Sequence, residues 1–268
     1  MNITLNGKLI HTDFTSVYEL KKSLSVDDDS IVIINGFQTN QDYILSANDS
    51  IVIIKKGVMP SKEEFESMIS ARHTPQVYNE LKKSKVAIAG LGGLGSNIAI
   101  MLARTGVGHL LLIDFDTVEP SNLNRQHYFI KHLSMPKTLA LKEQINDINP
   151  FITVETKTVF IDETNIKTLF KDYELVCEAF DNPVCKATLV NTILTELPST
   201  KIVASSGMAG YDSSNIIKTE KKMKNFYICG DLKNEAKIGT GLMAPRVQIC
   251  AGHQANMIVR LLLGIEEV

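Results

Sequence analysis

The sequence predicts an α/β protein: a Rossmann-like, mostly parallel sheet with helices on both faces, plus a small N-terminal β-grasp (ubiquitin-like) domain. Three observations support this prediction. Short apolar runs alternate with helical patterns in the second part of the chain, a glycine-rich turn joins the first of these strands to a helix, and residues 1–57 show a strand-and-helix pattern of their own. We therefore expect one domain over residues 1–57 and a second over residues 58–268.

The composition argues against several kinds of partner. The chain has 268 residues, of which 44% are hydrophobic and 22% are charged, enough for a sizeable core. Its net charge of -2 gives no overall attraction for nucleic acid or membrane surfaces, and no apolar run is long enough to cross a bilayer. The four cysteines form no Cys-x-x-Cys pair. We expect a cytoplasmic protein that binds neither nucleic acid nor membrane.

Residues 1–57 are predicted to form strand, strand, helix, strand and strand in that order. Ile3 and Leu5 alternate with polar residues and lead into an Asn-Gly turn, and residues 16–24 have the apolar spacing of a helix. Two further apolar runs, residues 31–34 and 51–54, are separated by turn-forming residues. This is the element order of a β-grasp fold.

The rest of the chain begins with a linker at residues 55–61 and continues as alternating strands and helices. The expected strands span residues 86–89, 109–114, 154–159, 175–179 and 202–205. The expected helices span residues 63–69, 76–84, 96–105, 139–148, 163–170, 183–197 and 253–263. Because strands that alternate with helices pair in parallel, this order predicts a doubly wound sheet.

A glycine-rich motif lies between the first strand and helix of this sheet. Its glycines are Gly90, Gly92, Gly93 and Gly95, which permit a tight turn and let the backbone approach a phosphate. Asp114 ends the next strand about twenty residues later, where a carboxylate can accept hydrogen bonds from ribose hydroxyls. The motif therefore predicts a nucleotide site, although the same pattern is typical of NAD-dependent dehydrogenases.

Two cations favour ATP over NAD. Arg125 and Lys137 follow in loops near the carboxyl ends of strands, where ligands bind in an open sheet. Attack on an α-phosphate with loss of pyrophosphate needs charge neutralisation, whereas hydride transfer does not. Asp181, at the end of another strand, could hold magnesium (Mg²⁺) between phosphate oxygens or cap the helix that follows it. The residues alone leave these two interpretations of Asp181 open.

Several motifs together resemble the adenylating enzymes of ubiquitin-like proteins. They are GLGGLGS, DFDTVEPSNLNRQ, MPK, the strand-end FDN and the ending GLMAP followed by HQANMIVRLLLG. Residues 61–268 are most similar to the ThiF type, the sulfur-carrier adenylyltransferases of thiamine biosynthesis, and more loosely to the molybdopterin counterpart MoeB.

The resemblance implies roles for individual residues. It implies phosphate binding by the loop from Gly90 to Gly95, a metal-associated carboxylate at Asp181, and an arginine, Arg72, that reaches ATP across a dimer interface. The residues that it implies for the remaining nucleotide contacts are Asp114, Asp116, Asn122, Arg125, Gln126 and Lys137.

The resemblance also implies an activity, in which ATP adenylates the C-terminal glycine carboxylate of a ThiS-type sulfur carrier and pyrophosphate is released. Arg125, Lys137 and Asp181 are the expected catalytic residues, ATP and Mg²⁺ the cofactors, and a homodimer the expected assembly. The alternatives are adenylation of a carrier from the molybdopterin or cysteine pathway, activation of a tRNA base, an NAD-dependent oxidoreductase, and a binding module without turnover.

The sequence departs from the family at two places. Relatives that bind structural zinc use two Cys-x-x-Cys pairs, which this chain lacks, so we expect no zinc. Cys229, expected in a loop, is the one candidate for covalent sulfur transfer, and an inert thiol is the favoured alternative.

The N-terminal unit resembles ThiS, but it continues through Gly57 instead of ending in Gly-Gly. A separate ThiS-type protein is therefore the expected substrate.

Overall fold

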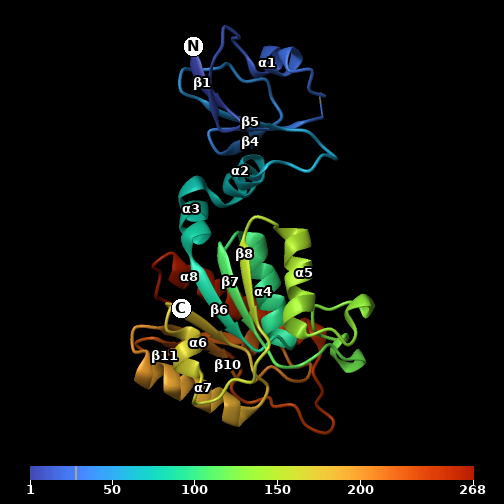
Figure 1. Cartoon of the computed structure of the whole chain (residues 1–268), viewed down its shortest axis with the longest axis vertical. Helices are drawn as coiled ribbons and strands as arrows, with labels where there is room; N and C mark the ends of the chain where they lie inside the picture. The colour runs from blue at the N-terminus through green and yellow to red at the C-terminus, as the bar shows by residue number, and fades with distance from the viewer. Residues whose placement is uncertain (28) are drawn as a thin grey trace. The chain divides into compact units, whose positions relative to one another are not determined.

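The computed structural model of the chain describes residues 1–27 and 29–268 and contains two separate sheets (Figure 1). Each sheet belongs to its own compact unit, residues Met1–Asn79 and Glu80–Val268. The helix α3 (Pro75–Lys83) spans the boundary between these units. The predicted boundary after residue 57 concerns the end of the β-grasp fold itself, and it stays a prediction.

The smaller unit contains a five-stranded sheet in the order β2-β1-β5-β3-β4. Its elements are β1 (Asn2–Leu5), β2 (Lys8–His11), α1 (Val17–Ser23), β3 (Ile31–Ile34), β4 (Phe37–Thr39) and β5 (Ser50–Ile54). The central strands β1 and β5 are parallel, and the hairpins β1–β2 and β3–β4 are antiparallel. Asn6 and Asn35 adopt positive φ in the two hairpin turns, a conformation that asparagine tolerates. The strand, strand, helix, strand, strand order is present, and β4 is an addition to the prediction.

Both faces of this small sheet are covered within the smaller unit. One face packs on α1, with Ile3, Leu20 and Ile51 in its core. On the other face, Val52 and Ile54 of the sheet contact side chains of α2 (Lys62–His73). The helix α2 is thus part of the small unit's packing.

A seven-stranded sheet forms the centre of the larger unit. Its strands are β6 (Lys85–Ala89), β7 (His109–Ile113), β8 (Thr153–Lys157), β9 (Leu175–Glu178), β10 (Lys201–Ser205), β11 (Lys218–Met223) and β12 (Phe226–Gly230). Its helices are α4 (Gly93–Thr105), η1 (Pro120–Asn122), η2 (Ile130–His132), α5 (Lys137–Ile148), α6 (Ile166–Phe170), α7 (Pro183–Glu196), η3 (Ser214–Ile216) and α8 (Ala244–Leu262).

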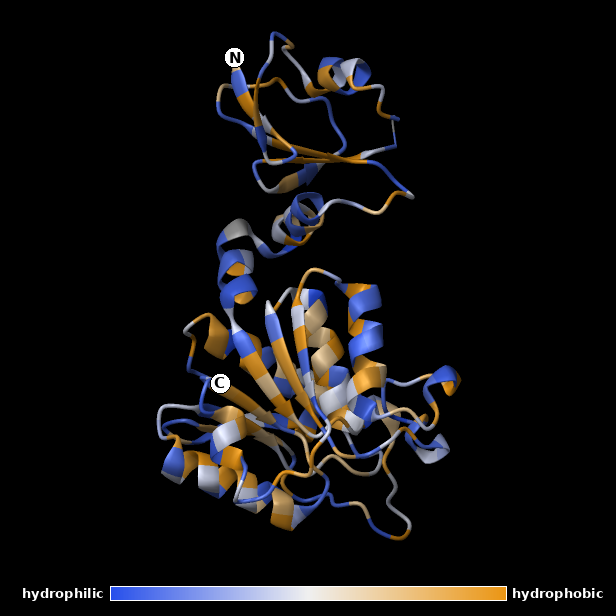
Figure 2. Ribbon diagram, in the orientation of Figure 1, coloured by the Kyte–Doolittle hydropathy of each residue, from blue (hydrophilic) through white to orange (hydrophobic). Residues whose placement is uncertain are grey.

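The strand order is β11-β12-β10-β9-β6-β7-β8, and every pair except β11–β12 is parallel. Helices α4, α5 and α8 pack on one face, and α6 and α7 pack on the other. The central strands are buried on both faces, which explains their nearly continuous apolar runs, largely orange in Figure 2. The predicted Rossmann-like sheet with helices on both faces is confirmed.

The strand order also determines where a ligand can bind. From β6 the chain moves outward through β7 and β8, then returns to the other side of β6 to form β9 and β10. The carboxyl ends of β6 and β9 therefore flank the point where the order reverses, the usual ligand crevice of such sheets.

Two segments differ from the sequence prediction. The last helix begins at Ala244 instead of residue 253. Pro245 lies in its first turn, where the backbone N–H has no intrahelical partner, so the proline does not interrupt the helix. The hairpin β11–β12 was not predicted, because β11 is an exposed edge strand rich in lysine, and lysine is not typical of strands.

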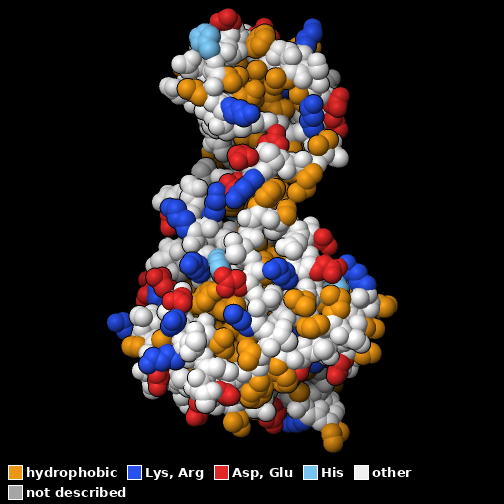
Figure 3. All heavy atoms as spheres, viewed as in Figure 1, with side chains coloured by type: hydrophobic (Ala, Val, Ile, Leu, Met, Phe, Trp, Pro, Cys, Tyr) orange, Lys and Arg blue, Asp and Glu red, His pale blue; other side chains and the backbone are white. Residues whose placement is uncertain are grey.

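Positive and negative side chains are interspersed on the face of each unit drawn in Figure 3. Among the described residues, no helix is long and apolar enough to span a membrane.

Candidate nucleotide site

The glycine-rich turn between β6 and α4 has no room for side chains at two positions. Gly90 has φ +89°, and a Cβ there would lie 2.9 Å from the backbone oxygen of Ala179. A Cβ on Gly95 would lie 1.9 Å from the backbone oxygen of Gly90. The tight turn predicted for this motif is therefore present, and it brings α4 close to the end of β6. By contrast, Gly92 has space for a Cβ, so packing does not explain that glycine.

The N terminus of α4 is open toward a pocket. Gly92 is its N-cap residue and supplies no side-chain cap to the first-turn amides. Gly92, Gly93 and Leu94 line the pocket. Because the first amides of a helix lack intrahelical acceptors and carry a partial positive charge, this is an anion-binding position.

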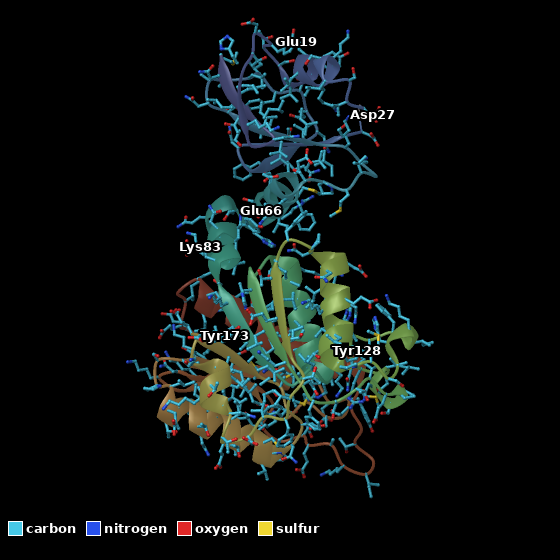
Figure 4. All side chains as sticks on the ribbon, viewed as in Figure 1. Glu19, Asp27, Glu66, Lys83, Tyr128 and Tyr173 are labelled. Atoms are coloured by element: carbon cyan, nitrogen blue, oxygen red, sulfur yellow. The ribbon has the colours of Figure 1, made fainter. Side chains whose placement is uncertain are left out.

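Tyr128 and Asp114 hold the glycine turn from its two sides. The hydroxyl of Tyr128, labelled in Figure 4, donates a 2.8 Å hydrogen bond to the Leu91 carbonyl. The Leu91 N–H donates to Oδ2 of Asp114 at 2.6 Å, and Oδ1 of Asp114 accepts from the Asp116 N–H at 2.8 Å. Asp114 is thereby fixed at the end of β7, where it lines the pocket.

A carboxylate–lysine pair lies beside Asp114. Nζ of Lys137 lies 2.7 Å from Oδ2 of Asp116, and only 7% of the Lys137 side chain is exposed. Burial raises the pKa of Asp114, and the positive charge of Lys137 opposes that rise. The site thus combines a partly desolvated carboxylate with a buried cation.

Asp181 lies in the turn after β9 and is not the cap of the following helix. Instead, Oδ1 of Asn182 accepts the hydrogen bonds of the Val184 and Cys185 N–H groups at the start of α7. The capping interpretation of Asp181 is therefore wrong. Asp181 is exposed and lines the pocket, and within the described residues its carboxylate has no hydrogen-bond or ion-pair partner.

The pocket encloses about 350 Å³ and joins most of the predicted site residues. Those in its lining are Gly90, Gly92, Gly93, Asp114, Asp116, Arg125, Gln126, Lys137 and Asp181. Gln126 is buried, and its side-chain oxygen has no hydrogen-bond partner within the described part of the chain. An unpaired buried acceptor in a polar pocket is available to a ligand.

Three predicted residues lie outside the lining. Gly95 lies beneath the turn, where its lack of a side chain is required. Oδ1 of Asn122 accepts from the Glu119 N–H at 3.0 Å, so it stabilises the η1 turn. Arg72 belongs to the smaller unit, where its guanidinium donates to the side-chain oxygen of Gln38 at 2.6 Å. Nucleotide contacts by Asn122 and Arg72 stay predictions.

The sequence interpretation missed a wall of the pocket formed by residues 206–208 and 234–236. This wall is held by Asp231, which forms a buried ion pair with Arg246 of α8. Nη1 of Arg246 also donates to the backbone oxygens of Asp212 and Ser213, at 2.5 and 2.8 Å. The local sequence contains no clear signal for this wall, because Arg246 follows Pro245 and lies before the predicted start of the last helix at residue 253.

Lys186 of α7 was also missed, although it lines the pocket. It pairs with Glu178, the fully buried last residue of β9. The signal in this case was a glutamate within the apolar run LVCEAF, because a buried acid needs a partner.

Cys229 is not in a loop, as expected, but in β12, where it is fully buried. Burial raises the pKa of its thiol to about 11. Because the reactive form of cysteine is the thiolate, this position favours the inert thiol. Within residues 1–27 and 29–268, no group of three or more His, Cys, Asp or Glu side chains is placed to hold a metal ion.

Comparison with known proteins identifies relatives in one functional group. The chain is 31% identical to the Escherichia coli molybdopterin-synthase adenylyltransferase over 69% of this chain and 75% of that protein. It is 33% identical to the sulfur carrier protein adenylyltransferase of Thermus thermophilus, over 46% of this chain and 47% of that protein. It is also 28% identical to the adenylyltransferase and sulfurtransferase UBA4 of Yarrowia lipolytica, over 69% of this chain. The chain spans 31% to 48% of the length of the first curated relatives that it matches.

Solved structures share the fold. The Escherichia coli tRNA N6-threonylcarbamoyladenosine dehydratase, solved in complex with ATP, matches with a TM-score of 0.69 at 20% identity, over 77% of this chain and 98% of that one. At this identity the likeness concerns the fold alone. The family models are more specific: the ThiF family matches residues 66–268, and the ThiS-like ubiquitin family matches residues 1–57. The chain therefore belongs to the ThiF family, with a ThiS-like domain at its N-terminal end.

Proposed function

We propose that this chain binds ATP in the pocket and adenylates the C-terminal carboxylate of a ubiquitin-like sulfur carrier, with release of pyrophosphate. The relatives named as adenylyltransferases support the reaction class. The observation that carries the proposal is the pocket itself, which combines an uncapped helix N terminus, the cations Arg125, Lys137 and Lys186, and the Asp181 carboxylate, which is unpaired within the described residues. An NAD-dependent oxidoreductase would not need Arg125 and Lys137 in this place.

Binding of the nucleotide follows from the wall formed by β6, α4 and β7. The α4 amides and the glycine turn accommodate the phosphates, because Gly90 and Gly92 bring backbone instead of side chains to the pocket. Asp114, fixed by the Leu91 and Asp116 amides, accepts hydrogen bonds from the ribose hydroxyls. The unpaired side-chain oxygen of Gln126 offers one further acceptor.

The chemical step needs positioning and charge stabilisation. A carboxylate oxygen of the carrier's terminal glycine, ionised at neutral pH, attacks the α-phosphorus of ATP. The bond from that phosphorus to the bridging oxygen breaks, and the electron pair leaves with pyrophosphate. The cations of Arg125 and Lys137, both in the pocket lining, stabilise the charge that develops on the phosphate oxygens. No side-chain base is required.

The site also fits a magnesium ion. Mg²⁺ is usually held by one or two carboxylates together with substrate phosphates, and it keeps several waters. Asp181 offers such a carboxylate, exposed to the pocket and unpaired within the described residues. When bound, the ion would neutralise phosphate charge.

The carrier that we propose as the substrate is a ThiS-type protein of thiazole biosynthesis, on a separate chain. The ThiS-like domain of this protein continues past Gly57 into α2, so it offers no free terminal carboxylate at that point. The name of the Escherichia coli relative makes a molybdopterin-type carrier the alternative. A homodimer in which Arg72 reaches the partner's ATP is part of the same proposal.

The test is carrier-dependent ATP–pyrophosphate exchange with two carriers that end in Gly-Gly, one of the ThiS type and one of the molybdopterin type. We expect exchange with the ThiS-type carrier and its loss in Asp181→Ala. The matched control is Asp147→Ala, an exposed aspartate of α5 outside the pocket lining.

Exchange with only the molybdopterin-type carrier would reassign the pathway. Exchange with neither carrier, together with tight NAD binding, would overturn the adenylation proposal.

A further inference from the structure

A buried acid–lysine pair lies next to the strand end that carries Asp181. Glu178 is fully buried, and Nζ of Lys186 lies 2.9 Å from each of its carboxylate oxygens. The side chain of Lys186 is 22% exposed and lines the nucleotide pocket. This pair thus joins the pocket to the interior of the sheet.

The Glu178 carboxylate fixes the turn that leads to Asp181. Its Oε1 accepts a 2.6 Å hydrogen bond from the Phe180 N–H, which belongs to the residue just before Asp181. A carboxylate bond to a backbone amide is short and strong, because the acceptor is charged. The backbone that presents Asp181 is therefore tied to Glu178.

The pair also reaches the neighbouring strand. Nζ of Lys186 lies 3.3 Å from Oγ of Ser205, the last residue of β10. The next two residues, Ser206 and Gly207, line the pocket. One ammonium group thus joins α7, the end of β9 and the end of β10.

Burial makes this arrangement rigid. A carboxylate without solvent needs a counter-charge, and removal of one partner of such a pair is strongly destabilising. Within the described residues, Lys186 is the cation that contacts Glu178, and its ammonium also contacts Oγ of Ser205.

We propose that Glu178 and Lys186 are positioning residues that hold the Asp181 turn in the orientation needed for the Mg²⁺–ATP complex. The inference rests on the proposed function and extends it by naming what determines the magnesium dependence of nucleotide binding. Neither residue needs to contact the metal. Lys186 acts through Glu178, and Glu178 acts through the Phe180 amide.

The experiment compares ATP affinity in Mg²⁺ and in EDTA by calorimetry, using the full-length protein and its Lys186→Met variant. We expect Lys186→Met to weaken binding of ATP with Mg²⁺ by at least about tenfold, the usual size for groups that orient a metal ligand. Binding in EDTA should change much less. Asp181→Ala should show the same pattern, and Lys186→Arg should restore most of the affinity in Mg²⁺.

Lys167→Met is the matched control. Lys167 of α6 forms a 3.1 Å pair with Glu196 of α7, the helix that also carries Lys186, but both side chains are largely exposed. This variant should bind ATP as the wild type does under both conditions. A Lys186→Met variant with a lower melting temperature but an unchanged ratio of the two affinities would show a merely structural role and overturn the inference.

A second variant covers the case in which Lys186→Met fails to fold. The double change Glu178→Gln with Lys186→Met removes both buried charges and keeps an oxygen for the Phe180 N–H. Its affinity in Mg²⁺ should fall because a neutral amide oxygen binds the Phe180 N–H less strongly than the carboxylate does, so the Asp181 turn is held less firmly. Wild-type binding would contradict the proposal.

The two proposals fail differently. A wild-type protein without ATP binding or exchange contradicts the proposed function, whereas an active wild type with unaffected Lys186 variants contradicts only this inference.

Discussion

The nucleotide pocket has two walls that are built in different ways. The wall of β6, α4 and β7 is made of backbone amides, the glycine turn and Asp114, all within 25 residues between Gly90 and Asp114. The second wall, residues 206–208 and 234–236, comes from two loops that the Asp231–Arg246 pair joins to α8. The first wall depends on the absence of side chains and the second on a side-chain pair.

This difference determines how each wall can fail. A wall made of backbone is disturbed by any added atom, because packing at the turn leaves no space. A wall held by a buried ion pair is disturbed by the removal of either partner, because the remaining charge stays without solvent.

Arg246→Met should have the largest effect. It leaves Asp231 buried without its counter-charge, and we expect a loss of about 3–5 kcal/mol in the free energy of unfolding. Urea denaturation measures this loss. Arg260→Met in the same helix is the control, because within the described residues the Arg260 guanidinium donates to one partner, the backbone oxygen of Glu267 near the surface. Equal stability of the two variants would show that the pair does not hold the second wall.

Gly95→Ala should have a smaller effect on stability, about 1–3 kcal/mol, because the new methyl group overlaps the Gly90 carbonyl. It should also weaken ATP binding, since the turn must move to make room. Calorimetry and urea denaturation check both effects. Gly252→Ala in α8 is the control: apart from the backbone of its own helix, no described residue lies within 4 Å of the added Cβ, so stability should stay the same or rise. Normal ATP affinity in Gly95→Ala would contradict the packing argument.

The smallest effects concern pH, and they have opposite signs in the two walls. For Asp231, burial alone would raise the pKa, but hydrogen bonds from Asn234, Lys233 and Arg246 outweigh it and lower the pKa. Its contribution to stability is present above the unfolded value near 3.9 and is lost as pH falls through the folded value. The stability difference between wild type and Asp231→Asn should therefore shrink from pH 7 to pH 3.

Asp114 should behave in the reverse way. Burial raises its pKa against the opposing charge of Lys137, so the folded state holds the proton more tightly than the unfolded state. Its contribution falls as pH rises from the unfolded value to the higher folded value. The difference between wild type and Asp114→Asn, measured by urea denaturation, should change with pH in the opposite direction to that of Asp231→Asn. Parallel slopes would contradict the assignment.

The first wall could be predicted because its signals are local. Glycines at fixed spacing, an acid at the next strand end and cations in the following loops lie close together in the sequence, and the parallel sheet brings strand ends to one edge. The structure places Gly90, Asp114, Lys137 and Asp181 in one pocket, as that reasoning required. The strand β11 could not be predicted in this way. Its lysine-rich sequence does not favour a strand, and it is a strand because it pairs with β12.

The sequence alone specifies the α/β fold, the glycine-rich turn and the ThiS-like first domain. Their signals, which are hydrophobic periodicity, glycine spacing and turn-forming residues, act between residues close together in the chain. The tertiary structure decided which residue caps α7, that Cys229 is buried, and that Glu178 meets Lys186. The cap depends on the backbone of the turn after β9, and the burial of Cys229 depends on the place of β12 in the sheet. The Glu178–Lys186 pair forms only because α7 packs beside the end of β9. Burial is a property of the folded chain, and it determines which charges must pair.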